Sequence, residues 1–117
     1  MELKKMSVMG MVDNAQGSEE EFSFPISFER VYRDYWYKFA NEKELYWLKF
    51  FLYGIEVERA NFNQARIELQ LFKDYLLNGG DFYYLSERKY IFSRIELFLE
   101  KLDEAESFRD DVVLYIG

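Results

Sequence analysis

The sequence predicts a mainly α fold: a compact four-helix domain around a buried central helix, with short extended segments at both ends. Two observations lead there. The segment 45–57 (LYWLKFFLYGIEV) contains only two charged side chains, and apolar residues recur at helical spacing in three other stretches. At 117 residues, the chain fits one domain, residues 1–117, whose core needs no disulfide or metal. We expect residues 1–21 to form an arm and an acidic loop, and residues 22–117 to form the helical core.

The N-terminal part of the chain is expected to be extended. Residues 1–12 contain a short apolar run typical of a strand or a packing arm, and residues 13–20 (DNAQGSEE) form a polar loop. Apolar side chains then alternate over residues 22–28, which indicates a strand, but Pro25 limits that strand to a sheet edge or to an extended lead-in. Ser27 is placed to begin the first helix as its N-cap.

The first helix has the clearest amphipathic pattern of the chain. Its expected inward face consists of Phe28, Val31, Tyr32, Tyr35, Trp36 and Phe39. Tyr37 instead lies among the charged residues of the opposite face, where an aromatic side chain is available for a partner.

The central helix is expected to begin near Asn41, because Glu44 three residues later completes a variant of the capping box. The segment is apolar on all sides and too short to cross a membrane, so it should be buried. Gly54 permits either close packing of the helix or a change to a strand over residues 55–59; we prefer the helix.

Two further helices complete the predicted core. The third runs from Asn61 to about Leu77 and ends at Asn78-Gly79-Gly80; the fourth begins at Ser86. The inward face of the third helix consists of Ala65, Leu69, Phe72 and Leu76, with a second ridge of Ile67, Leu71 and Tyr75. The inward face of the fourth consists of Ile91, Ile95, Phe98, Leu99 and Leu102. A small α+β fold is the alternative, if residues 22–28, 55–59 and 112–116 are all strands.

The composition argues against most catalytic chemistry. The sequence has no cysteine and no histidine, so it holds no thiolate or imidazole for a nucleophilic site or a metal. We therefore expect no enzyme, no cofactor and no metal site. Glu56 is the one acid within the apolar segment; desolvation raises its pKa, or it pairs with Lys49 or Arg59.

Negative charge is concentrated in two segments, and the chain carries −7 overall. Residues 13–21 contain four acids and no base, and residues 96–111 contain seven acids against Lys101 and Arg109. Such charge repels nucleic acid and anionic lipid and attracts basic proteins, although it also simply keeps a protein in solution. We expect a basic protein partner, and no nucleic-acid or membrane partner.

The expected function is protein binding by a small acidic domain in the cytoplasm. The most concrete form is an immunity-type inhibitor that neutralises a basic toxin such as a nuclease. An acidic secretion chaperone, a nucleic-acid-mimic inhibitor and a structural homo-oligomer are the alternatives. The expected partner-binding residues are acids, which steer association, and tyrosines, which anchor it. They are Glu19, Glu20, Glu21, Tyr37, Tyr83, Tyr84, Glu100, Asp103, Glu104, Glu106, Asp110 and Asp111.

Overall fold

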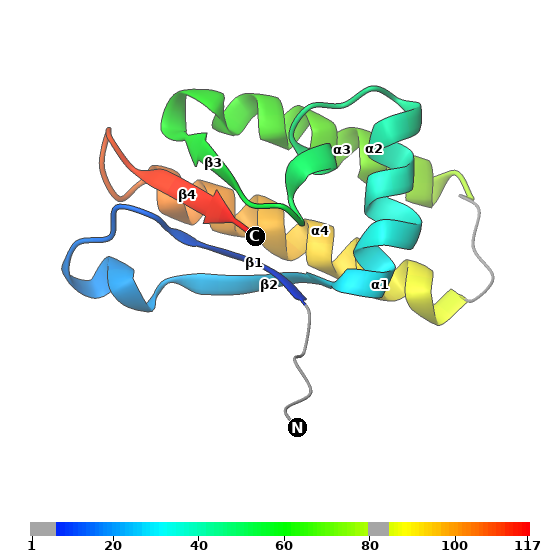
Figure 1. Cartoon of the computed structure of the whole chain (residues 1–117), viewed down its shortest axis with the longest axis horizontal. Helices are drawn as coiled ribbons and strands as arrows, with labels where there is room; N and C mark the ends of the chain where they lie inside the picture. The colour runs from blue at the N-terminus through cyan, green and yellow to red at the C-terminus, as the bar shows by residue number, and fades with distance from the viewer. Residues whose placement is uncertain (1–6, 80–84) are drawn as a thin grey trace.

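The chain forms an α+β fold in which helices pack on a four-stranded antiparallel sheet (Figure 1). The computed structural model describes residues 7–79 and 85–117. Of these residues, 59% lie in helices of all kinds and 19% in the sheet. The predicted mainly α, four-helix domain is therefore wrong, as is an all-α class. The α+β alternative is the architecture found, because each of its three candidate segments contributes a strand.

The sheet has the strand order β2-β1-β4-β3. Its strands are β1 (Ser7–Val12), β2 (Ser23–Phe28), β3 (Ile55–Glu58) and β4 (Val113–Ile116). The strands nearest the two ends of the sequence pair at the centre, with Gly10 opposite Ile116. Pro25 lies in β2 at the sheet edge, the first of the two positions predicted for it, where a residue without an N–H is tolerated.

Three helical bodies accompany the sheet. α3 (Phe62–Leu77) and α4 (Leu85–Glu106) lie side by side on one of its faces (Figure 1). Their positions confirm the predicted third and fourth helices. A third helical rod runs through α1 (Glu29–Val31), a π-helical stretch (Tyr32–Tyr37) and α2 (Lys38–Glu42). It starts after Phe28, and the Ser27 hydroxyl donates to the Phe28 carbonyl instead of capping the helix.

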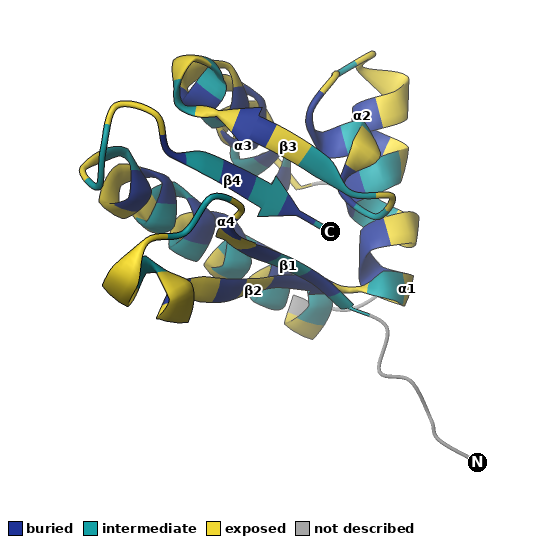
Figure 2. Cartoon of the chain, turned by 60° about the vertical axis from the view of Figure 1, so that its left-hand side comes forward, coloured by how far each residue is buried: buried dark blue, intermediate teal, exposed yellow. Residues whose placement is uncertain are grey.

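The core fills the space between the sheet and these helices. Alternate strand residues point inward, so Val8 and Val12 of β1 and Leu114 and Ile116 of β4 are buried (Figure 2). Large aromatic residues dominate the fully buried set, which includes Tyr32, Trp36, Phe51, Phe62, Phe72 and Phe98. Aromatic packing therefore accounts for much of the unusual Phe, Tyr and Trp content.

The predicted central helix over residues 45–57 does not exist. Its first half forms a 3₁₀ turn (Leu48–Phe50), and its second half becomes β3. Trp47, Leu48 and Phe51 are buried, while Tyr46 and Tyr53 are exposed. The apolar side chains of this segment are therefore divided between two environments: some cover the core, and others face solvent.

At two backbone positions the chain departs from helical geometry. Glu44 and Gly54 have φ angles of 55° and 90°, values that a right-handed helix excludes. Gly54 also lies directly against the hydroxyl of Tyr115, so a side chain at position 54 would collide with it. Beyond it, β3 pairs with β4, placing Val57 opposite Leu114. These contacts join residues far apart in sequence, and local spacing does not reveal them.

Glu56 lies on the exposed face of β3 and pairs with neither Lys49 nor Arg59 in the part of the chain described. The Asp13 carboxyl lies beside it, and this neighbour, more than desolvation, raises the pKa of Glu56. Because folding raises the pKa of Glu56, the protonated side chain stabilises the folded state. This contribution to the free energy of unfolding is complete at pH values below the ordinary pKa of 4.5, and it is lost as the pH rises through the pKa of Glu56 in the folded state.

Replacing Glu56 with glutamine should therefore raise the thermal unfolding midpoint at pH 7, because the substitution removes repulsion from Asp13. The gain should vanish below about pH 4, where the glutamate is already protonated. Thermal unfolding followed by circular dichroism at both pH values measures this difference. Glu42→Gln is the matched control, since Glu42 is exposed and has no ion pair among the described residues. An equal increase in the unfolding midpoint of Glu56→Gln at both pH values would show that repulsion from Asp13 is not what the substitution removes.

Candidate functional site

The two acidic segments lie together at one end of the molecule (Figure 1). One follows β1 and forms the 3₁₀ turn Gly17–Glu21; the other spans the end of α4 and the loop to β4. Arg109 joins them, because its Nη2 lies 2.7 Å from the Glu19 carboxylate, while its Nη1 lies 2.6 Å from Asp111 of its own segment. It also donates to the carbonyl of Asn14. Because these bonds tie the two loops, the acidic end, meaning residues 13–21 and 100–111, is a fixed surface.

Several acids of this end are already paired within the chain. Arg66 of α3 lies 2.9 Å from both Asp103 and Glu106, and it lowers the pKa of Glu106 by a hydrogen bond to the charged form. Arg109 lowers the pKa of Glu19 in the same way. The ion pairs of these carboxylates connect α3 to α4 and connect the two acidic loops, so these acids contribute to the stability of the fold.

Other acids of this end form no ion pair within the described residues. They are Asp13, Glu20, Glu21, Glu100 and Asp110, all of them exposed, and Asp13 lies beside Glu56 of β3. A hollow of about 310 Å³ lies between the 3₁₀ turn and α4, with Glu21 and Glu104 on its rim and Phe22 and Phe108 among its lining residues. The acidic end therefore offers unpaired carboxylates beside a small partly apolar depression.

The tyrosines that the sequence singled out are not part of this arrangement. Tyr37 is half-buried and packs against the core ring of Tyr32, and the helical rod that carries it stands at the opposite end of the molecule from the acidic turn (Figure 1). Tyr83 and Tyr84 lie outside the described residues. The structure thus brings the predicted acids together and places Tyr37 elsewhere.

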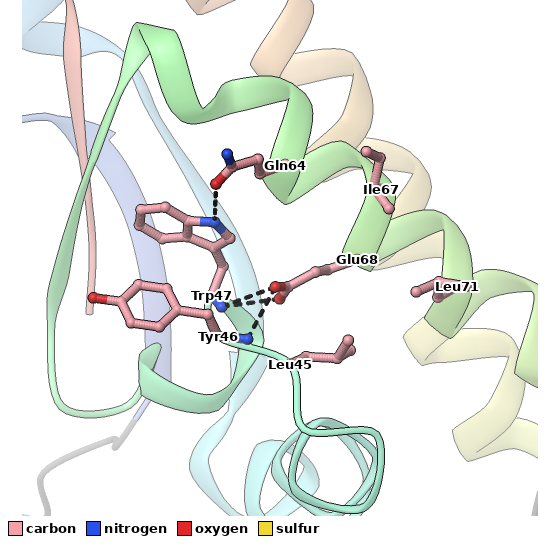
Figure 3. Close-up of a pocket in the computed structure, with 7 residues that line it drawn as sticks. All are labelled: Leu45, Tyr46, Trp47, Gln64, Ile67, Glu68 and Leu71. Atoms are coloured by element: carbon pink, nitrogen blue, oxygen red, sulfur yellow. Dashed lines mark hydrogen bonds between the residues drawn. The ribbon is translucent and has the colours of Figure 1, made fainter.

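A second surface, which sequence reasoning missed, is an apolar groove between α3 and the segment before the Leu48–Phe50 turn (Figure 3). We call it the α3 groove; its volume is about 550 Å³. It is lined by Leu45, Tyr46, Trp47, Gln64, Ile67, Glu68 and Leu71. Ile67 and Leu71, one helical turn apart on α3, are 61% and 46% exposed, which are large values for apolar side chains. Tyr46 is 59% exposed, and its ring points away from them (Figure 3).

Glu68 builds this groove. Its nearly buried carboxylate accepts hydrogen bonds from the backbone N–H groups of Tyr46, Trp47 and Leu48 at 2.9–3.2 Å (Figure 3). The Trp47 indole N–H donates to the Gln64 side chain at 3.3 Å. One helix side chain therefore caps the start of the 3₁₀ turn and fixes the wall opposite α3. The second apolar ridge of the predicted third helix was the signal in the sequence for this surface.

The comparisons with known proteins give no relative from which to argue. No protein-family model matches the chain, and searches of curated proteins and solved structures give no significant match. Within residues 7–79 and 85–117, no group of three or more acidic side chains could hold a metal ion. No helix in those ranges is long and apolar enough to cross a membrane. The acidic end and the α3 groove are therefore two surfaces of this chain that suggest a function.

Proposed function

We propose that this chain is a small acidic protein-binding domain, most concretely an immunity-type inhibitor that neutralises a basic toxin such as a nuclease. The observation that carries the proposal is the convergence of the two acidic segments at one end, where Arg109 holds them in a fixed arrangement. A chain without cysteine suits the reducing cytoplasm, where we place this activity.

Preorganisation is the main physical argument. Glu20, Glu21, Glu100 and Asp110 form no ion pair with a described residue, so a basic partner can pair with them without first breaking an internal one. Glu20, Glu21 and Asp110 lie in segments that Arg109 ties together, and Glu100 lies in α4, so little entropy is lost in ordering them on binding. The concentrated negative charge accelerates encounter with a basic surface and repels phosphate backbones. These properties favour a protein partner over a nucleic acid.

Reversing two unpaired acids should slow association with such a partner. The variant Glu20→Lys/Glu21→Lys should bind a basic partner protein, sought among the products of neighbouring genes, with a lower on-rate than the wild type. The deficit should be largest at low salt and should shrink towards 1 M salt, where the Debye length falls to about 3 Å. Biosensor kinetics across ionic strength measure both effects. Asp103 and Glu106 are unsuitable for this test because their reversal would also break ion pairs to Arg66.

The matched control reverses Glu42 alone and is compared with the single variant Glu20→Lys, so that the net charge changes by the same amount. Glu42 is an exposed acid at the end of α2, has no described ion pair and is not part of the lining of the α3 groove. Only the Glu20 variant should lose on-rate substantially. Equal rates for the wild type and both variants at low salt would show that the acidic end does not steer binding.

A further inference from the structure

We propose that the open face of the sheet, meaning the side opposite α3 and α4, binds a basic amphipathic helix of a partner protein. A lysine or arginine of that helix lies over Asp13 and Glu56. Its apolar side chains cover Met11 and Tyr115. The inference rests on the proposed function in taking the partner to be a basic protein, and it adds a contact surface and the kind of element that this partner presents.

The open face carries apolar side chains that no α-helix of residues 7–79 and 85–117 covers. The strands lie in front of α3 and α4 in Figure 2, with nothing helical packed on their near side. Because side chains alternate along a strand, every second residue points away from the core. Four of these residues are apolar and none is buried: Met9, Met11, Val113 and Tyr115. The sheet therefore presents apolar area to solvent, and Met11 is 39% exposed.

The strand pairing sets carboxylates beside these apolar side chains. Met11 of β1 lies opposite Tyr115 of β4, and Tyr115 lies opposite Glu56 of β3, so the three form one row across the sheet. In the next row, Val113 lies opposite Glu58. Side chains that are opposite each other on one face of a sheet are close neighbours. The open face is thus apolar at its centre and acidic at the β3 border.

The acids at this border have no counter-charge among the described residues. Asp13, Glu56 and Glu58 are exposed and form no ion pair there. The Asp13 carboxyl is hydrogen-bonded to that of Glu56, and the charges of Asp13 and Glu58 both raise the pKa of Glu56. The pairing also places the side chain of Tyr115 beside Glu56. The groups that act on Glu56 therefore include two acids and no base.

This charge favours a basic occupant over the alternatives. A lysine or arginine beside the two carboxyls replaces repulsion with attraction, and a guanidinium group can bond to both at once. A second copy of the chain would instead add the same acids to the contact. A nucleic acid or an anionic membrane would be repelled. The repulsion between Asp13 and Glu56 destabilises the free chain, and a cation from a partner relieves it.

The width of the open face fits one helix. The row that begins at Ser23 of β2, opposite Met11, and ends at Glu56 of β3 crosses all four strands. At a spacing of about 4.8 Å between strands, this row is about 14 Å wide. A helix with its side chains is about 10–12 Å across. Asp13 also begins the acidic end, so a partner whose helix lies on the open face can reach the unpaired acids of that end.

The methionine methyl groups provide a direct test by NMR. The chain is labelled with ¹⁵N and with ¹³C at the methionine methyl groups, and the signals of Met9 and Met11 are assigned by substitution. The probe is a synthetic helix-forming peptide of leucine and arginine. Both methyl signals should shift and saturate as the peptide is added. The indole signal of Trp36, which is fully buried in the core, should stay in place.

Matched variants separate docking on the open face from general attraction to an acidic protein. Glu56→Gln should bind the peptide about fivefold more weakly, whereas Glu42→Gln, which removes an exposed charge at the end of α2, should bind normally. Met11→Ser should also weaken binding about fivefold. Leu77→Ser, a change to an exposed leucine of α3, should have no effect. A peptide with glutamate in place of arginine should not move the methyl signals.

The Glu56→Gln variant also distinguishes a binding role from a structural one. The substitution should raise the unfolding midpoint at pH 7 while it weakens binding, a combination that a misfolded variant does not produce. In the wild type, a cation beside Glu56 favours the charged form of the carboxyl. Binding should therefore release protons near the pKa of Glu56 and should tighten as the pH rises through it. Calorimetry in two buffers of different ionisation enthalpy measures this release, which Glu56→Gln should reduce.

Several results would overturn the inference. The Met9 and Met11 signals could remain still at saturating peptide, respond equally to the glutamate peptide, or shift with the concentration of the chain alone, which would mean that a second copy covers the face. Equal binding by Glu56→Gln and the wild type would also overturn it. Methyl shifts combined with unchanged on-rates for Glu20→Lys/Glu21→Lys keep the open face and reject the acidic end as a steering surface. The opposite combination keeps the steering surface and rejects the open face.

Discussion

Replacing Phe72 with alanine should lower the free energy of unfolding by about 3–5 kcal/mol, the cost of truncating a fully buried aromatic residue. Phe72 is completely buried on α3. Its ring meets that of Trp36 edge to face at 5.2 Å and stacks on Phe39 at 4.9 Å. Truncation removes both ring contacts and leaves a cavity between α3 and the helical rod, which the surrounding aromatic rings fill only in part.

Urea unfolding followed by tryptophan fluorescence measures this loss, because Trp36 reports on the same cluster. Leu71→Ala is the matched control, since it alters the neighbouring residue of α3 at an exposed position. The control should cost less than about 1 kcal/mol. Similar losses for the two variants would mean that α3 does not face the core as described.

Replacing Glu68 with alanine is the second large expected effect, a loss of about 2–4 kcal/mol. The substitution leaves the backbone N–H groups of Tyr46, Trp47 and Leu48 without their acceptor, and an unsatisfied buried donor costs about 1–3 kcal/mol. The total loss in the free energy of unfolding should stay below the sum of the costs of three unsatisfied N–H groups, because water from the groove can bond to the freed N–H groups. Equilibrium unfolding measures the loss.

The same variant should also show where the loss arises. Hydrogen exchange at the amides of residues 46–48 should accelerate, whereas exchange within the sheet should change only with global stability. Gln64→Ala is the control, because it removes a single long hydrogen bond to the Trp47 indole and should cost less than about 1 kcal/mol. Unchanged exchange at residues 46–48 in Glu68→Ala would contradict the capping role.

Local patterns predicted the elements that carry a clear periodicity or a proline signal in their own residues. The 3.6-residue period located α3 and α4, and Pro25 placed β2 at a sheet edge. The prediction of a helix over residues 45–57 failed because the structure of this segment depends on residues far away in the sequence. The capping carboxylate comes from Glu68, and β3 exists through its pairing with β4. An apolar segment of this length has the same composition whether it is a buried helix or a turn followed by a strand.

The candidate site was predictable in composition and not in arrangement. The clustered acids were visible in the sequence, but their meeting depends on the pairing of β1 with β4 and on the Arg109 bridge to Glu19. The groove required knowing that the ridge of Ile67 and Leu71 remains exposed. Sequence spacing shows that a helix has two apolar faces; it does not show which of them other elements cover.

The central claim is that this chain neutralises a basic protein, and the most direct test is inhibition. Basic toxin domains are sought among the products of the genes adjacent to that of this chain, and the activity of each purified domain is titrated with the purified wild-type chain. The account predicts that activity falls in proportion to added chain and is abolished near equimolar amounts, with Glu20→Lys/Glu21→Lys inhibiting more slowly at low salt. Full toxin activity in the presence of excess chain, or the lack of any basic neighbour that the chain inhibits, would contradict it.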